Sequence, residues 1–97
     1  MRTIISGPVT EAHLADAELL AGITPTSFVT NGLSSPPVSK LPTEVYPLCP
    51  MQPEESRVRA RNYTLTQNAD ALVCVGGDDH LVALARRYDL PVYEVLE

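Results

Sequence analysis

The residues best suited to chemistry lie together in the last third of the chain, where two glycines precede two aspartates and a histidine. Gly76 and Gly77 can bring backbone N–H groups close to an anion, because glycine has no side chain in the way. Asp78 and Asp79 can cap a helix or bind ribose hydroxyls, and His80 can act as an acid or base near neutral pH. The pattern therefore predicts either an ordinary helix start or the ligand-binding end of a strand.

The segments around these five residues predict a strand, a helix and a second strand. Residues 71–75 form a short unbroken apolar run, and a second apolar run lies within residues 90–95. Between them, the helical spacing predicts that one face is buried, with Leu81, Leu84, Ala85 and Tyr88 on it. A strand–helix–strand unit makes the two strands parallel, and open parallel sheets bind ligands outside the carboxyl ends of their strands.

A second candidate group lies on the preceding predicted helix, which begins at residues 53–55. Arg57, Arg59 and Arg61 place three of the seven basic residues within five positions, and Arg61 can give a phosphate a charge-assisted hydrogen bond. Asn62 is polar on an otherwise apolar face, so burial obliges it to find partners. The arginines and Asn62 have two interpretations. In the first, the arginines are solvated and Asn62 holds a neighbouring loop; in the second, they form a ligand site.

The first third of the chain predicts two more strands with a helix between them. Residues 3–6 form the first strand, Thr10 can cap the following helix, and residues 26–30 form the second strand. The spacing predicts an inner helix face of Ala12, Ala15, Leu19 and Leu20. Six of the nine prolines lie between Pro36 and Pro53, where they disfavour a long helix and leave residues 44–46 as the plausible strand.

Length, charge and cysteine content limit the class of protein. A chain of 97 residues predicts one domain, residues 1–97, and its net charge of -5 opposes binding to duplex nucleic acid or to an anionic membrane. No apolar segment approaches the ~20 residues that span a bilayer, so we expect a soluble cytoplasmic protein. Cys49 and Cys74 have no metal-binding or redox spacing, and no metal or other cofactor is expected. So small a core favours a homo-oligomer.

Several segments together resemble a known family. Residues 1–7, residues 23–32, the Arg61-Asn62 pair and the strand entry at residues 69–73 look like the SLOG superfamily of Rossmann-like proteins, in its small YspA-like and YpsA-like branch. The resemblance implies an α/β fold: a three-layer open parallel sheet of about five strands with helices on both faces. It also implies binding of nucleotide-derived ligands, in a superfamily of nucleotide sensors and phosphoribohydrolases often found in bacterial and phage conflict systems. Its two ligand loops map to Ser6, Gly7, Pro8 and Thr10, and to Asn31, Gly32, Ser34 and Ser35.

The chain also departs from the family pattern. In phosphoribohydrolases the glycine pair opens a Gly-Gly-x-Gly-Thr-x-x-Glu pattern, whereas here Asp79 replaces the third glycine and Ala83 replaces the glutamate. We therefore expect a noncatalytic module that senses or sequesters a phosphate-bearing, nucleotide-derived molecule. Two alternatives stay open: an N-glycosidic hydrolase or transferase with Asp78, Asp79 or His80 in place of the glutamate, and a degenerate interaction subunit. The expected ligand-binding residues are Ser6, Gly7, Thr10, Asn31, Gly32, Ser34, Arg61, Asn62, Gly76, Gly77, Asp78 and Asp79.

Overall fold

The sheet is open and entirely parallel, as the sequence predicts. The computed structural model describes residues 1–30, 42–45, 53–77 and 79–96. Within these ranges it has five strands: β1 (Arg2–Ser6), β2 (Ser27–Thr30), β3 (Thr43–Val45), β4 (Ala71–Val75) and β5 (Val92–Val95). They lie in the order β3-β2-β1-β4-β5, and every neighbouring pair is parallel. This is a Rossmann-like α/β arrangement.

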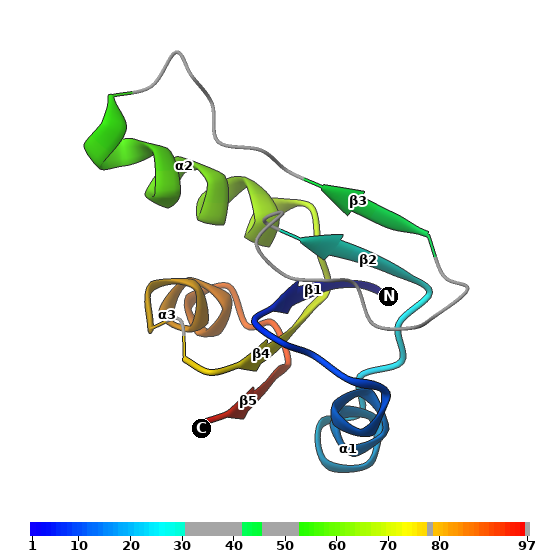
Figure 1. The fold of residues 1–97 in the computed structure, drawn as a ribbon. Coiled ribbons are helices and arrows are strands. Elements are labelled where there is room, and N and C mark those ends of the chain that lie inside the picture. The colour runs from blue at the N-terminus through cyan, green and yellow to red at the C-terminus, as the bar shows by residue number, and fades with distance from the viewer. Residues whose placement is uncertain (31–41, 46–52, 78, 97) are drawn as a thin grey trace.

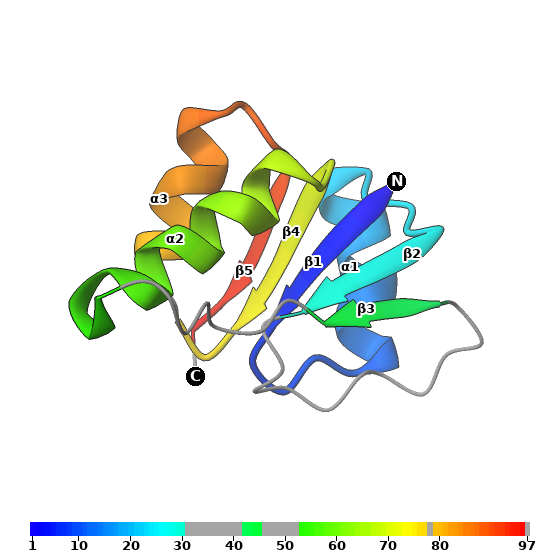
Figure 2. The same ribbon diagram turned by 90° about the horizontal axis from the view of Figure 1, so that it is seen from above.

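Helices cover both faces of the sheet, which gives three layers. α1 (Glu11–Ala21) lies on one face, and α2 (Glu54–Gln67) and α3 (Asp79–Arg87) lie side by side on the other (Figure 2). Because side chains alternate along a strand, each strand contributes to two cores. Ile4 of β1 and Leu72 of β4 pack under α2 and α3, whereas Ile5 and Val73 pack under α1.

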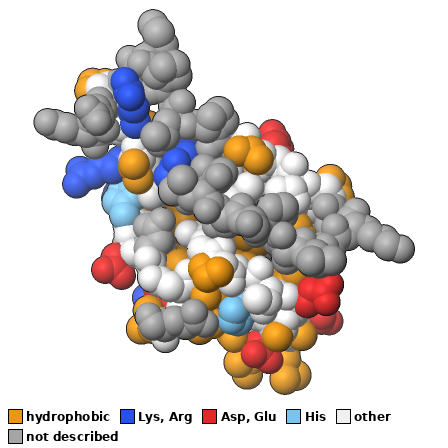
Figure 3. Space-filling view, in the orientation of Figure 1, with side chains coloured by type: hydrophobic (Ala, Val, Ile, Leu, Met, Phe, Trp, Pro, Cys, Tyr) orange, Lys and Arg blue, Asp and Glu red, His pale blue; other side chains and the backbone are white. Residues whose placement is uncertain are grey.

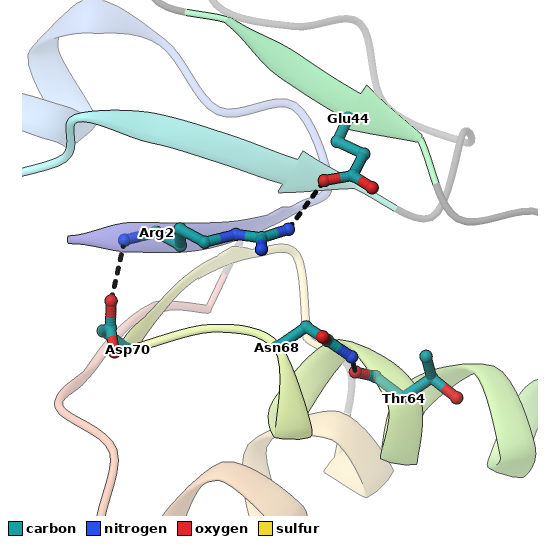
Figure 4. A network of polar contacts seen from close by, with 5 residues as sticks. All are labelled: Arg2, Glu44, Thr64, Asn68 and Asp70. Atoms are coloured by element: carbon teal, nitrogen blue, oxygen red, sulfur yellow. Dashed lines mark hydrogen bonds and ion pairs between the residues drawn. The ribbon is translucent and has the colours of Figure 1, made fainter.

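Polar contacts fasten the amino edge of the sheet. The N–H of Arg2 donates to Asp70 Oδ2 at 3.0 Å, and the N–H of Asp70 donates to the Arg2 carbonyl at 2.7 Å (Figure 4). The Arg2 guanidinium reaches Glu44 of β3 at 2.6 Å, although both side chains are well exposed and the pair contributes at most about 1 kcal/mol. Asn68 closes the end of α2 by donating to the Thr64 carbonyl at 2.8 Å. These contacts leave the opposite, carboxyl edge as the place for a site.

The predicted inner face of α1 is wrong. Ala17 is the buried residue of this helix, whereas Ala12 and Ala15 are exposed, and Leu19 and Leu20 are 81% and 72% exposed. The helix has apolar residues on most of its sides, so their spacing did not select the side that the sheet covers. A small residue, Ala17, meets the sheet instead and permits close packing.

The predicted burial of Tyr88 is also wrong. Tyr88 follows the last residue of α3 and remains 40% exposed, whereas Leu81 and Ala85 are buried as predicted. Its ring stacks edge-on against Tyr63 of α2, with ring centres 6.1 Å apart and planes at 72°. Tyr88 therefore joins the two helices at their surface rather than in the core.

Candidate functional site

The candidate site lies where β1 and β4 end, at the carboxyl edge of the sheet (Figure 1). The two strands are neighbours, but the chain leaves β1 toward α1 on one face and leaves β4 toward α3 on the other. Such a switch point is where open α/β sheets bind ligands. Ser6, the last residue of β1, pairs in register with Cys74 and is 6% exposed on the α2 and α3 face.

The turn after β1 is explained by folding alone. Gly7 has a φ of +81°, and a Cβ at this position would overlap the Val75 carbonyl oxygen and lie 2.9 Å from its carbon. Thr10 is the N-cap of α1 and accepts from the N–H of His13 at 3.3 Å, while its own N–H donates to His13 Nδ1 at 3.1 Å. Each of these residues has a structural role that needs no ligand.

The turn after β4 is open. Gly76 and Gly77 have φ values of +91° and +83°, so both adopt a backbone conformation that favours glycine. A Cβ on Gly76 would meet nothing within 4 Å, and one on Gly77 would meet only a Leu96 methyl group at 3.9 Å. The N–H of Gly76 donates to the Val95 carbonyl at 2.8 Å, which removes it from the groups available to an anion. Space in front of the turn therefore has no occupant among the described residues.

The most unusual side chain at this edge is Asn62 of α2. It is fully buried, and its Nδ2 donates to Nδ1 of His80, in the first turn of α3, at 3.0 Å. Because Nδ1 accepts this bond, the neutral ring carries its proton on Nε2. Asn62 Oδ1 is buried and has no hydrogen-bond partner among the described residues. Leaving such an acceptor unsatisfied costs about 1–3 kcal/mol, so the oxygen calls for an explanation.

α2 extends beyond the sheet and carries its basic residues with it. Its 14 residues span about 21 Å, whereas a five-residue strand such as β4 spans about 17 Å. Val58 lies one turn before Asn62 and is 46% exposed. In Figure 3, Lys and Arg side chains gather at the upper left, where Figure 1 places this end of α2, with a histidine below them. Arg61 itself is 8% exposed.

The structure thus separates the predicted site residues into three groups. At the carboxyl edge on the α2 and α3 face it places Ser6, Arg61, Asn62, Gly76, Gly77, Asp79 and His80. Gly7 and Thr10 lie at the same edge but serve the β1–α1 turn. Asn31, Gly32, Ser34 and Asp78 lie outside the described residues. The pairing of Asn62 with His80 was missed, because nothing in the spacing of two helices shows which of their side chains meet.

The described ranges contain neither a cluster of metal-binding side chains nor a helix that could span a membrane. No group of three or more His, Cys, Asp or Glu residues there is arranged to hold a metal ion. Each helix in the same ranges is too short or too polar to cross a membrane.

The fold and this edge define a Rossmann-like α/β domain with buried polar side chains at its switch point. No protein-family model matches the chain, and neither a curated protein nor a solved structure matches it. The fold class therefore rests on the order and direction of the strands, and the resemblance to the SLOG superfamily stays a prediction.

Proposed function

We propose that the protein binds a nucleotide-derived, phosphate-bearing small molecule at the carboxyl edge of the sheet, on the α2 and α3 face. The observation that carries the proposal is Asn62, which is fully buried: its Nδ2 donates to His80, and its Oδ1 has no partner in the part of the chain that the structure describes. A buried acceptor that the fold leaves unsatisfied is explained when a ligand hydroxyl or N–H donates to it. Membership of the SLOG superfamily belongs to the same proposal.

Charge and backbone geometry at this edge suit a phosphate. Arg61 adjoins Asn62 on α2 and supplies a guanidinium, which recognises phosphate through paired hydrogen bonds. α3 begins at Asp79, two residues after Gly77, and the start of a helix favours an anion. These features give a chain of net charge -5 a local place for a negative ligand.

The rest of a nucleotide has suitable contacts as well. Val58 is half-exposed one turn before Asn62, and its apolar surface suits the face of a base or a ribose. Asp79 is exposed at the start of α3, where a carboxylate can accept from ribose hydroxyls. The phosphate, sugar and base thus each have a candidate partner on α2 or α3.

Thermal unfolding with a panel of ligands tests the proposal. The probes are inorganic phosphate, adenosine monophosphate, ADP-ribose, NAD and a cyclic dinucleotide. A ligand at 100 times its Kd stabilises the fold by about 2.7 kcal/mol, which raises the Tm of a domain this small by roughly 10 °C or more. The same shift should disappear in Asn62→Leu.

Asn68→Leu is the matched control, because Asn68 ends the same helix at the opposite edge of the sheet and its side chain donates to the Thr64 carbonyl within that helix. It should keep the ligand-induced shift. The proposal fails if no probe raises the Tm, or if Asn62→Leu responds like the wild-type protein.

A second function, cleavage of an N-glycosidic bond, is favoured by one observation. Asn62 fixes the His80 ring by its Nδ1, and this leaves Nε2–H as a donor at an exposed position. Incubation with nucleoside monophosphates followed by chromatography separates the two functions. Release of free base that is lost in His80→Gln would show catalysis, whereas binding without product would support the sensor or sequestration role.

A further inference from the structure

The outward side of α1 presents an apolar surface with an acidic rim. Ala12, Ala15 and Leu19 lie three and four residues apart on the side away from the buried Ala17, and Leu20 adjoins them. We call these four residues the α1 stripe. Its flanks carry Glu11, Asp16 and Glu18, and the helix contains no Lys or Arg. Figure 3 shows orange and red side chains at the lower end of the molecule, where Figure 1 places α1.

The opposite layer presents an aromatic surface with a basic rim. Tyr63 and Tyr88 stack edge-on across the seam of α2 and α3 and remain 50% and 40% exposed. Arg59 lies one helical turn before Tyr63, and Arg87 precedes Tyr88; both arginines are exposed. We call these four residues the tyrosine ridge. Asp89 follows Tyr88, so the two arginines leave the ridge and its flank with a net positive charge.

We propose that the α1 stripe of one molecule docks on the tyrosine ridge of a second copy of this chain. The two surfaces lie on opposite faces of the sheet, so they can meet only between molecules (Figure 2). Each joins exposed apolar side chains to a net charge, which is negative at the stripe and positive at the ridge. Tyrosine and arginine are also the residues most enriched at protein interfaces.

Charge decides against the simpler arrangement in which two α1 stripes pair with each other. That contact would set the three carboxylates of one helix against the same three of its partner, and neither α1 helix contains a Lys or Arg to offset them. Pairing of unlike surfaces is head-to-tail, and it leaves one stripe and one ridge free at the ends of each assembly. Such contacts continue into a ring or an open chain. Asn62 and Gly77 belong to neither surface, so this association is independent of the proposed ligand site.

Two blocked variants test the arrangement by sedimentation velocity. Leu19→Lys places a cation in the stripe, and Arg59→Glu with Arg87→Glu reverses the rim of the ridge; all three positions are exposed, so folding should be kept. The wild-type protein should form species larger than a dimer at high micromolar concentration and lose them in high salt. Each variant alone should sediment as a monomer. An equimolar mixture should form a dimer and nothing larger, because only one intact stripe and one intact ridge remain.

The control is Leu96→Lys, which makes the same change at a leucine that is 75% exposed, follows the last residue of β5 near Gly77 and belongs to neither surface; it should associate like the wild-type protein. The proposal is overturned if the wild-type protein is monomeric throughout, or if the mixture of variants stays monomeric. Dimers that survive the arginine changes but not Leu19→Lys would show a stripe-to-stripe contact instead. Circular dichroism of each variant confirms that loss of association is not loss of folding.

Discussion

The two turns that leave the carboxyl edge of the sheet differ in how completely folding explains them. The turn after β1 closes on itself: Gly7 packs against the Val75 carbonyl, and Thr10 and His13 exchange hydrogen bonds at the start of α1. The turn after β4 leaves space in front of Gly76 and Gly77, and its histidine bonds a residue of another helix. Glycine and histidine lie at or near both turns, so these residue types do not distinguish them.

The comparison shows which kind of observation separates structure from function here. Where the polar groups of a turn find local partners, folding alone explains its residues and no ligand is needed. Where a buried atom such as Asn62 Oδ1 has none, the fold carries a cost that folding does not explain. The predictions below test whether the first turn is structural and the second functional.

The largest effect is expected from Gly7→Ala. The new Cβ combines left-handed strain with overlap of the Val75 carbonyl, and we expect a loss of about 3–5 kcal/mol in the free energy of unfolding. Gly77→Ala has the strain without the overlap and should cost about 1–2 kcal/mol. Urea denaturation of both variants measures the difference. Equal losses would mean that the two turns are equally constrained, and the comparison would fail.

Thr10→Ala should have a smaller effect on stability and none on ligand binding. The change removes the side-chain acceptor for the His13 N–H, and loss of such a cap costs about 1 kcal/mol. Thr10→Ser keeps the hydroxyl and should restore most of the stability. If Thr10→Ala folds but loses the ligand-induced Tm shift, Thr10 contributes to ligand binding and the turn after β1 is not purely structural.

Asn62→Leu should leave the free energy of unfolding unchanged or raise it by up to about 1 kcal/mol when no ligand is present. Leucine has a similar size, and the change removes a buried oxygen that no described residue satisfies, while the exposed His80 ring can bond water instead. Denaturation without ligand checks this expectation. A loss above about 2 kcal/mol would show that Asn62 serves the fold, and its open oxygen would then not indicate a ligand.

The fold was predictable because the local patterns agree with one another. The apolar run of β4, the start of α3 at Asp79 and the second run at β5 each indicated a parallel strand–helix–strand unit, and the structure confirms it. The same unit also predicted that Gly76 and Gly77 lie at the carboxyl edge of the sheet. The sequence also marked Asn62 as polar on an apolar face, and burial confirms the anomaly.

Other features depend on how elements pack, which the chain does not encode locally. α1 has apolar residues on most of its sides, so the sheet rather than the spacing selected Ala17 as its buried residue. The contact between Asn62 and His80 joins two helices, and the overhang of Val58 depends on where α2 sits along the sheet. The first could not be predicted because Asn62 and His80 are 18 positions apart on different helices. The second could not be predicted because the pattern of one helix does not fix its position along the sheet.

The smallest predicted effect concerns the contact that attaches α1 to β5. This contact, like the turn after β1, is explained by folding alone. The pKa of Tyr93 is raised above 10.0, first by burial and then by the charge and hydrogen bond of Asp16, whose Oδ2 accepts from the phenol at 3.4 Å. The native state therefore holds this proton more tightly than the unfolded chain does, and stability falls as the pH rises above about 10. Asp16→Asn should lower the pKa of Tyr93 toward its ordinary value, which ultraviolet titration of the phenolate measures against Tyr93→Phe. An unchanged titration would show that the contact between Asp16 of α1 and Tyr93 of β5 does not form in solution. The structural account of how α1 is attached would then be wrong at this contact.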